Sequence, residues 1–522
     1  MKNTTRTTSP ITFIKDDTIN NNRMNLNKKH AIILAILTIS IFIIRILIAF
    51  SQPGFTYESY FHLRHIESIK ETGLPLLNDP LSYGGRELRF LPLFHYLIAA
   101  LSLILPLHLA AILLPNLFLA LVPLIIYVIV QKITTNQHIP LICASMSAIL
   151  PFLFNPNSVT PETLFIPLFL LTLYAFLNLE QPHYPHIYTL LFIATTLTSS
   201  ATILLILGFA LYLLLCFIEN RLVPKQESEI VLFSLFFFVW SQLLFFKETF
   251  LTQGLSFIWQ NIPPQIIQQY FPTASLLQVI ASITIIPFIA GTVVVYKNLF
   301  QGKNAHAILL ISFALVTSIL TFFRFMKLSF ALALFSIILT LLFAFFYEEL
   351  ATYLHKTKMS RKTFFLPIIT SIILAITILP ATIGAIHNQQ IPTTSEIEAF
   401  QWLENSTPQP GGVLALLEEG HLVTYFSKKP NVMDDQFLLI DNVEERFNDL
   451  HSLYTTSFQT QAIDLLQKYQ IRYLVLSPRA QEIYGIQNFR YFDPACFVPI
   501  YNKEVKIYKV TCTIEQKTPP LQ

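Results

Sequence analysis

The stretch IFIIRILIAFSQPGFTYESYFHLRHIE, residues 41–67, joins an apolar segment directly to a run of titratable side chains. The apolar segment extends from His30 to Phe50, and about 20 residues are enough for a helix to span a bilayer. The whole 522-residue chain is apolar, with 53% hydrophobic and 12% charged residues and 46 Phe. This composition predicts a multi-pass membrane protein, and a net charge of +3 without a basic cluster argues against nucleic acid as a partner.

The N-terminal residues 1–29 are polar, rich in Asn and Thr, and end with Lys28 and Lys29. A secretory signal would carry its basic residues near residue 1 and end at a small-residue cleavage site after a shorter apolar run. We therefore expect residues 1–29 to be a disordered cytoplasmic tail and His30–Phe50 to be a retained membrane anchor.

Hydropathy predicts about eleven spanning helices within residues 30–387, which we take as the transmembrane domain. The segment His186–Thr198 is the shortest of these helices. The expected spans are His30–Phe50, Leu109–Val130, His138–Phe154, Glu162–Leu179, His186–Thr198, Ala201–Ile218, Ile230–Phe246, Leu276–Tyr296, Ala305–Phe323, Met326–Phe346 and Thr363–Ile386.

The segment Leu91–Pro106 is also apolar, but the distribution of basic residues argues against a crossing there. If it does not cross, every basic loop lies on the cytoplasmic side, as the positive-inside rule requires. We therefore expect Leu91–Pro106 to be a re-entrant or surface helix within a first outer loop over residues 51–108. We expect the protein to lie in the cell membrane with its C-terminal domain on the outer side. The basic residues that then share one side are Lys28, Lys29, Lys132, Arg221, Lys225, Lys297, Lys303, Lys356, Lys358, Arg361 and Lys362.

The composition changes after residue 395, and residues 395–522 predict an extracytoplasmic α/β domain. Ser395 with Glu398 matches a capping box before AFQWLE. GGVLALL and IRYLVLS read as strands, QAIDLLQKYQ as a helix and CFVPIYNKEVKIYKVTC as a hairpin. The ends of that hairpin carry Cys496 and Cys512, which either form a disulfide in an oxidising exterior or remain two buried thiols.

Two carboxylates mark the expected outer face of the membrane domain. Glu58, His62 and His65 are spaced at i, i+4 and i+7, so they share one helix face. The alternative for this helix is an interfacial amphipathic helix with a solvated polar side. Glu162 follows Pro161 at the start of a span, where an acid also stabilises a helix N-terminus. Two such carboxylates can hold a divalent cation, since hard cations take oxygen ligands.

Basic residues near and within the spans are the other candidates. Arg324 and Lys327 flank two adjacent spans, where they either clamp an anionic headgroup or only snorkel to the interface. Arg45 lies inside the first span without an obvious partner, and we assign it no role. The Cys and His residues show no metal-ligand spacing, which argues against a zinc site.

These segments, in this order, resemble the catalytic subunit of oligosaccharyltransferase, especially its archaeal single-subunit forms, which are C-type glycosyltransferases. The resemblance rests on ESYFHLRHIE, ETGLPLLNDPLSYGG, an acid at the start of a span and IEAFQWLENSTPQPGGVLALLEEGHLVTYFSKKPNVMD. In the family a stretch like DPYYHLR follows the first span, so the resemblance gives Glu58 the role of its acid. Glu162 takes the place of the second acidic motif, and Arg324 that of the arginine that meets the donor's phosphate. His62 and Arg64 would support this site.

The chain departs from the family at its WWDYG motif, which binds the hydroxyl of the Asn-x-Ser/Thr acceptor. Leu416–Gly420 aligns with this motif, and the Trp residues of the chain lie elsewhere, at positions 240, 259 and 402. Glu418 and His421 could still form an acceptor pocket. The alternative is that LLEEGH only ends a strand and caps a helix.

The resemblance implies a glycosyltransferase that uses a polyprenyl (dolichyl) phosphate-linked sugar donor and Mn²⁺ or Mg²⁺. The expected reaction is most like N-glycosylation of a secreted or membrane protein, with Glu58 and Glu162 as catalytic residues and metal ligands. One alternative is transfer to a lipid, a glycan or Ser/Thr, and another is a non-catalytic relative that binds lipid-linked glycans. A transporter is less favoured because the sequence shows no inverted repeat.

Overall fold

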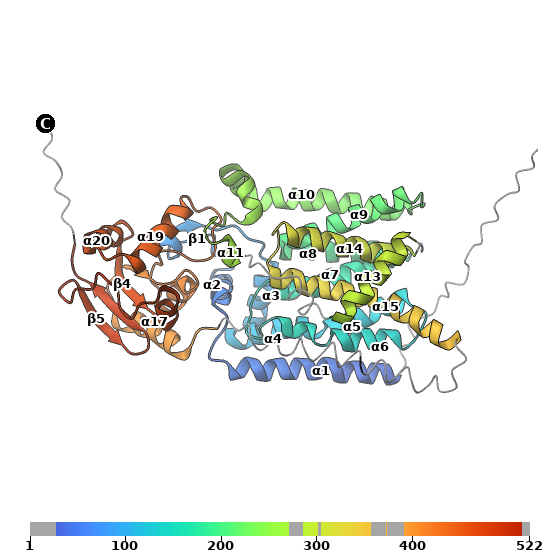
Figure 1. Ribbon diagram of the computed structural model, residues 1–522, viewed down its shortest axis with the longest axis horizontal. Coiled ribbons are helices and arrows are strands. Elements are labelled where there is room, and N and C mark those ends of the chain that lie inside the picture. The colour runs from blue at the N-terminus through green and yellow to red at the C-terminus, as the bar shows by residue number, and fades with distance from the viewer. Residues whose placement is uncertain (1–27, 271–284, 301–303, 357–371, 373–390, 514–522) are drawn as a thin grey trace, which may run out of the picture.

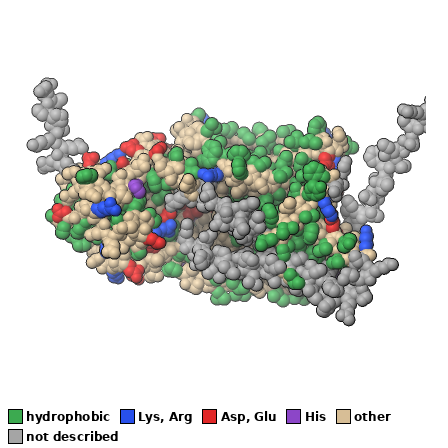
Figure 2. Space-filling model, viewed as in Figure 1, with side chains coloured by type: hydrophobic (Ala, Val, Ile, Leu, Met, Phe, Trp, Pro, Cys, Tyr) green, Lys and Arg blue, Asp and Glu red, His purple; other side chains and the backbone are tan. Residues whose placement is uncertain are grey.

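The computed structural model describes residues 28–270, 285–300, 304–356, 372 and 391–513. Long helices lie side by side along the longest axis of the molecule, and a smaller region of strands and short helices covers one end of them (Figure 1). The space-filling view shows hydrophobic side chains along the helices, whereas charged side chains gather on the smaller region and at the opposite end (Figure 2). The described chain is thus mostly helical, with a C-terminal sheet region.

The bundle is built from apolar helices whose facing sides form one large core. Helix α14 packs on α9 and α15, and α7 packs on α8 and α4. The bundle helices are α1 (Lys28–Ser51), α4 (Leu107–Ala120), α5 (Val122–Ile133), α6 (Ile139–Ser147), α7 (Glu162–Phe176), α8 (Tyr184–Thr198), α9 (Ile203–Ile218), α10 (Lys225–Gln253), α13 (Ile285–Phe300), α14 (Ala305–Phe322) and α15 (Leu328–Lys356). Short turns of helix at Leu150–Leu153, Ser200–Thr202 and Gly254–Trp259 join them, and α11 (Ile267–Tyr270) follows the last of these turns.

The described residues contain 6 helices that are long and apolar enough to cross a membrane. The predicted count of about eleven is therefore not confirmed. Several of the predicted spans coincide with shorter apolar helices. The helix at the expected span His186–Thr198 is α8, which has 15 residues. The expected span Thr363–Ile386, apart from Ile372, and the tail 1–27 lie outside the described residues. The six long helices are Lys28–Ser51, Leu107–Ile133, Ser200–Ile218, Lys225–Trp259, Ala305–Phe322 and Leu328–Leu354.

The segment that we expect to be the first outer loop, residues 51–108, contains two helices at the end of the bundle. Helix α2 (Tyr57–Thr72) packs on α3 (Leu93–Ser102), which in turn packs on α4. With 10 residues, α3 is about 15 Å long, and the expectation of a re-entrant or surface helix at Leu91–Pro106 stays a prediction. Between α2 and α3, β1 (Asn78–Asp79) pairs with β2 (Arg86–Glu87), and Ser82–Gly84 forms a helical turn.

The C-terminal region contains a four-stranded sheet in the order β3-β4-β6-β5. The central strand β4 (Ile471–Leu476) is rich in buried aliphatic residues, pairs in parallel with β3 (Gly412–Leu414) and runs antiparallel to β6 (Lys506–Val510). β5 (Phe497–Asn502) completes the predicted hairpin, and a disulfide joins the sulfurs of Cys496 and Cys512. The helices are α17 (Thr394–Ser406), α18 (Gly420–Leu422), α19 (Val443–Thr455), α20 (Gln459–Lys468) and α21 (Pro478–Tyr484), with one further turn at Val423–Ser427.

Two local predictions for this region were wrong in their bounds. The capping box is formed by Thr393 and Glu396, not by Ser395 and Glu398, so α17 begins two positions earlier than expected. The Thr393 hydroxyl accepts from the Glu396 backbone N–H, and the Glu396 carboxylate accepts from the Thr393 backbone N–H. The predicted strand GGVLALL ends at Leu414, because the chain then turns into α18.

Arg45, which had no obvious partner in the sequence, is buried inside the bundle and has several partners. Its Nε donates to Asn116 Oδ1 at 2.7 Å, and its guanidinium also donates to the carbonyl oxygens of Pro151 and Phe154. None of these partners is a carboxylate. The charge is therefore held by amide and carbonyl dipoles that join α1, α4 and the turn at Leu150–Leu153.

Candidate functional site

Helix α2 turns its face with Glu58, His62 and His65 toward protein, whereas Lys70 and Glu71 in its last turn are exposed. His62 and His65 are both buried, and Glu58 is partly buried. The face with Glu58, His62 and His65 is therefore not a solvated side of the helix. The aromatic ring of Phe61, on the same helix, lies 5.4 Å from the His421 ring of the C-terminal region. The C-terminal region thus covers the polar face of α2.

The loop before α7 is held against the first turn of α2. The Thr56 backbone N–H donates to Asn157 O at 3.2 Å, and the Ser59 hydroxyl accepts from the Val159 backbone N–H at 2.8 Å. These bonds place Glu162, the first residue of α7, on the same side as Glu58. The Oε2 atom of Glu162 is buried and has no hydrogen-bond partner among the described residues.

Lys327, in the connection between α14 and α15, provides the positive charge next to these acids. Its Nζ donates to Glu58 Oε1 at 2.5 Å, and about a third of each side chain is exposed. Burial alone would lower the pKa of Lys327. The negative charges of Glu58, Glu162 and Asp435 outweigh burial and raise that pKa above its ordinary value, so Lys327 is an ammonium at neutral pH.

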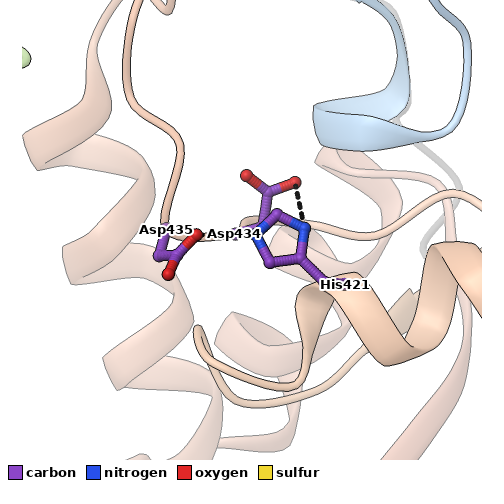
Figure 3. Close-up of side chains that lie close together, drawn as sticks. All are labelled: His421, Asp434 and Asp435. Carbon is purple, nitrogen blue, oxygen red and sulfur yellow. Dashed lines mark hydrogen bonds and ion pairs between the residues drawn. The ribbon is translucent and has the colours of Figure 1, made fainter. Parts of the chain in front are cut away.

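A second group of polar side chains lies in the C-terminal region. His421, from α18, lies between Asp434 and Asp435, which follow one another on a loop (Figure 3). Its Nε2 is 2.6 Å from Asp435 Oδ1, and its Nδ1 is 3.9 Å from Asp434 Oδ2. Burial would lower the pKa of His421, but the two carboxylates raise it. Burial would raise the pKa of Asp435, but His421 and Lys327 lower it to about 2.

The ligand atoms of His421, Asp434 and Asp435 lie within 4.8 Å of one another, so this group could hold a metal ion. Asp434, however, already has many partners. Its carboxylate accepts from Ser82 Oγ at 2.5 Å and from Asn431 Nδ2 at 3.0 Å, and lies 3.6 Å from Arg86. These contacts join the first outer loop to the C-terminal region.

Histidines on α2 and α3 complete the buried surroundings of Glu58. The ring nitrogens His62 Nδ1 and His95 Nε2 are 2.9 Å apart. Burial, His95 and Lys327 all lower the pKa of His62 well below its usual value, so this imidazole is neutral at neutral pH. A neutral pair of this kind supports α2 by hydrogen bonding and adds no charge to the site.

The other residues predicted from the sequence have separate partners. Arg64 makes a bidentate ion pair with Asp79, with both distances at 2.7 Å, which fixes the β1–β2 loop. Glu418 pairs with Arg479 at 2.6 Å, whereas His421 pairs with Asp435, so the two expected acceptor residues contact different groups. Arg324 is half-buried in the same connection as Lys327, with a φ of 59°, and it is Lys327 that contacts Glu58.

Sequence reasoning missed Asp434 and Asp435 as site residues. They stand together at the end of KKPNVMDD, and two consecutive acids in an otherwise weakly charged chain were an available signal. Their proximity to His421 depends on the conformation of an irregular loop, which the helix and strand periods of a sequence do not predict. Sequence reasoning singled out Lys327 but gave the leading role to Arg324.

Comparison with known proteins places this arrangement in a known fold. No protein-family model and no curated protein matches the chain. Among solved structures, the oligosaccharyltransferase of Archaeoglobus fulgidus tethered to an acceptor peptide with the NVT sequon superimposes with a TM-score of 0.65. The match has 16% identity and covers 87% of this chain and 69% of that one. The same enzyme, AglB, with an inhibitory peptide and a dolichol-phosphate gives 0.65 at 16% identity, over 86% and 69% of the two chains.

A second protein shares the fold across nearly its whole length. ArnT from Cupriavidus metallidurans, bound to undecaprenyl phosphate, gives a TM-score of 0.52 at 10% identity over 92% of this chain and 98% of that one. At such identities the likeness concerns the fold alone. The chain therefore shares its fold with the archaeal oligosaccharyltransferase and with ArnT, as the resemblance in its sequence predicted.

Proposed function

We propose that this chain, which has the C-type glycosyltransferase fold, transfers a sugar or oligosaccharide from a polyprenyl (dolichyl) phosphate-linked donor to an acceptor. The reaction takes place at the outer membrane face, with the N-terminus cytoplasmic and the C-terminal domain outside. The observation that carries the proposal is that Glu58, Glu162 and Lys327 converge where the helical bundle meets the C-terminal region. The solved relatives hold polyprenyl phosphates in the same fold, which supports this class of donor.

The charges of the site suit a divalent cation. Glu58, Glu162 and Asp435 face a single ammonium, Lys327, so the fixed charge is negative where an anionic phosphate must leave. We assign the cation to Glu58 and Glu162, because Glu162 Oε2 is buried and unpartnered among the described residues and carboxylate oxygens suit Mn²⁺ or Mg²⁺. When bound, the cation would offset negative charge on the leaving phosphate.

The protein's own residues then act on the two substrates. Glu58 orients the acceptor and takes its proton, since it stands at the exposed edge of the site. Arg324 and Lys327, three residues apart in one connection, bind the donor phosphate. His421 holds Asp435 in place from the C-terminal region. The buried rings of His62 and Phe61 exclude water from the inner side.

An alternative location for the cation is the group of His421, Asp434 and Asp435. It is less favoured for two reasons. Asp434 already accepts hydrogen bonds from Ser82 and Asn431, and Asp435 Oδ1 is already paired with His421 Nε2 at 2.6 Å. Loss of cation binding in Glu162→Gln rather than in Asp434→Asn distinguishes the two locations.

The acceptor is most like that of protein N-glycosylation, namely a secreted or membrane protein. A second candidate is transfer to a lipid, a glycan or a Ser/Thr hydroxyl. One observation favours it: Glu418 pairs with Arg479 and His421 with Asp435, so the pocket proposed for the sequon hydroxyl is engaged by the chain itself. The family's Trp pair is also missing there.

The test compares wild-type protein in lipid nanodiscs with Glu58→Gln and a matched control, Glu67→Gln. Glu67 lies on the same helix and contacts Tyr425 and Lys428 of the C-terminal region, away from Lys327. The reaction contains a cell-extracted polyprenyl-linked glycan pool, Mn²⁺ and a tagged Asn-x-Thr peptide. We expect metal-dependent donor consumption in wild type and in Glu67→Gln, and a loss of at least about 100-fold in Glu58→Gln.

The products separate the remaining alternatives. Glycopeptide would establish oligosaccharyl transfer to a sequon. Donor consumption without glycopeptide would point to the second acceptor class. Equal donor consumption in wild type and Glu58→Gln would contradict the proposed site. No consumption by any variant, with the A. fulgidus enzyme active in parallel, would indicate a non-catalytic glycan-lipid-binding protein.

A further inference from the structure

Lys327 is paired with a carboxylate that the proposed cation would also bind. Its ammonium makes a 2.5 Å contact with Glu58 Oε1, and Glu58 is one of the two carboxylates to which we assign the cation. The Lys327 side chain is 33% exposed, so it has room to move without opening the core. Four rotatable bonds let such an ammonium swing through several ångströms while its backbone stays fixed.

The surroundings give the ammonium two alternative kinds of partner. On one side lie the carboxylates of Glu58, Glu162 and Asp435. The neutral ring of His62 stands behind them and does not compete for a proton with the ammonium. On the other side, the donor phosphate that we propose would approach the connection that carries both Arg324 and Lys327.

An ammonium and a divalent cation repel one another, so each weakens the binding of the other to the same carboxylate. We propose that Lys327 and the divalent cation compete for Glu58, so that cation binding releases the Lys327 ammonium to the anionic phosphate of the donor. This inference rests on the proposed function. It makes Lys327 a phosphate-binding residue whose position couples the two binding events.

The coupling has a required thermodynamic form. If the cation frees Lys327 for the phosphate, then the phosphate also draws Lys327 away from Glu58 and tightens cation binding by the same factor. In the unliganded site Lys327 offsets part of the negative charge and pairs with Glu58. The ion pair between Lys327 and Glu58 is therefore the state of the site before the cation and the donor phosphate bind.

The experiment measures Mn²⁺ binding by the loss of the free-ion electron paramagnetic resonance signal, so it needs no turnover. The full-length protein is used in neutral-lipid nanodiscs and in nanodiscs that contain undecaprenyl phosphate. The variants are Lys327→Met, which removes the ammonium, and Lys327→Arg, which keeps the charge. Size-exclusion profiles and thermal unfolding verify that each variant is folded.

We expect Lys327→Met to bind Mn²⁺ roughly fivefold more tightly than wild type in neutral lipid, the scale of one partly exposed ion pair. Lys327→Arg should stay within about twofold of wild type. Undecaprenyl phosphate should tighten Mn²⁺ binding in wild type. This effect should be smaller in Lys327→Met, where only the direct attraction between the cation and the phosphate remains.

Each other result overturns the inference in a distinguishable way. Equal or weaker binding by Lys327→Met, with normal Mn²⁺ binding by wild type, rejects the competition and leaves the proposed function intact. If neither protein binds Mn²⁺, both the competition and the assigned cation fail, and donor consumption in metal-free buffer then shows whether the glycosyltransferase proposal survives. Undiminished coupling in Lys327→Met would mean that another residue links cation and phosphate.

Discussion

The Tyr57 hydroxyl donates a 3.1 Å hydrogen bond to Glu396 Oε2 and so joins α2, at the end of the bundle, to α17 of the C-terminal region. A second carboxyl, that of Glu419, is fully buried nearby, and its Oε1 has no hydrogen-bond partner among the described residues. Burial and the adjacent Glu396 raise the pKa of Glu419 to about 7. Two acids therefore share a buried junction between the two parts of the chain.

This junction predicts a stability that depends on pH near neutrality. Because the folded state raises the Glu419 pKa, it binds a proton more tightly than the unfolded chain does. Stability should therefore fall as pH rises from about 4.5 to about 7, by up to roughly 3 kcal/mol. Glu419→Gln should remove most of this fall and raise the melting temperature at pH 8.

The measurement is thermal unfolding of the purified protein at pH 5, 6, 7 and 8 with a fixed scan rate. Glu398→Gln is the matched control, because Glu398 is an exposed acid on α17. Its pH profile should follow that of wild type. A Glu419→Gln profile with the wild-type slope would show that Glu419 is ionised at no cost in the folded protein.

Substitution of Glu162 tests where the cation binds. Glu162→Gln keeps the shape of the side chain but removes its charge, and its buried Oε2 would no longer be a strong ligand. Loss of a residue that merely supports a metal ligand costs about 10–100-fold in affinity, so we expect Mn²⁺ affinity to fall by roughly 100-fold. Calorimetric titration in nanodiscs measures it. Glu71→Gln, an exposed acid on α2, should bind as wild type does. A loss in Asp434→Asn but not in Glu162→Gln would move the cation to the His421 group.

The sequence predicts features that depend on neighbouring residues better than contacts between residues far apart in the chain. Hydropathy locates apolar helices well: the expected span Leu109–Val130 corresponds to the long helix Leu107–Ile133, which contains α4 and α5. Strand β4 and helix α20 follow from local patterns. The charged helix α2 and its Glu58 were likewise visible as an excess of titratable groups beside a span.

Contacts between distant segments were not visible in the same way. Lys327 meets Glu58 across 269 positions, and Tyr57 meets Glu396 across 339. No helical or strand period relates such pairs, because loop conformation and the docking of the C-terminal region bring them together. His421 and Asp435 are only 14 positions apart, yet their pairing depends on an irregular loop.

The Cys496–Cys512 disulfide predicts a measurable contribution to stability. The bridge joins the ends of the β5–β6 hairpin across a sequence separation of 16 residues. Closing a loop of this size in the unfolded chain is worth about 3 kcal/mol in the chain-entropy description. The double variant Cys496→Ser/Cys512→Ser should therefore unfold at lower guanidinium concentration, as followed by far-UV circular dichroism. Wild-type protein treated with reductant should reproduce the shift. A double variant as stable as oxidised wild type would contradict this prediction.

Replacement of Arg45 should destabilise the bundle without touching the outer face. Its guanidinium donates to Asn116 Oδ1 and to the carbonyls of Pro151 and Phe154. Arg45→Met would leave these acceptors buried and unpaired, at a cost of about 1–3 kcal/mol for each group that water cannot reach. Arg45→Lys should rescue only partly, since one ammonium cannot reproduce the planar fork. Thermal unfolding in detergent compares both with Leu47→Met, a substitution at a 64% exposed position of the same helix. Equal melting temperatures for Arg45→Met and Leu47→Met would show that the three acceptors find other donors.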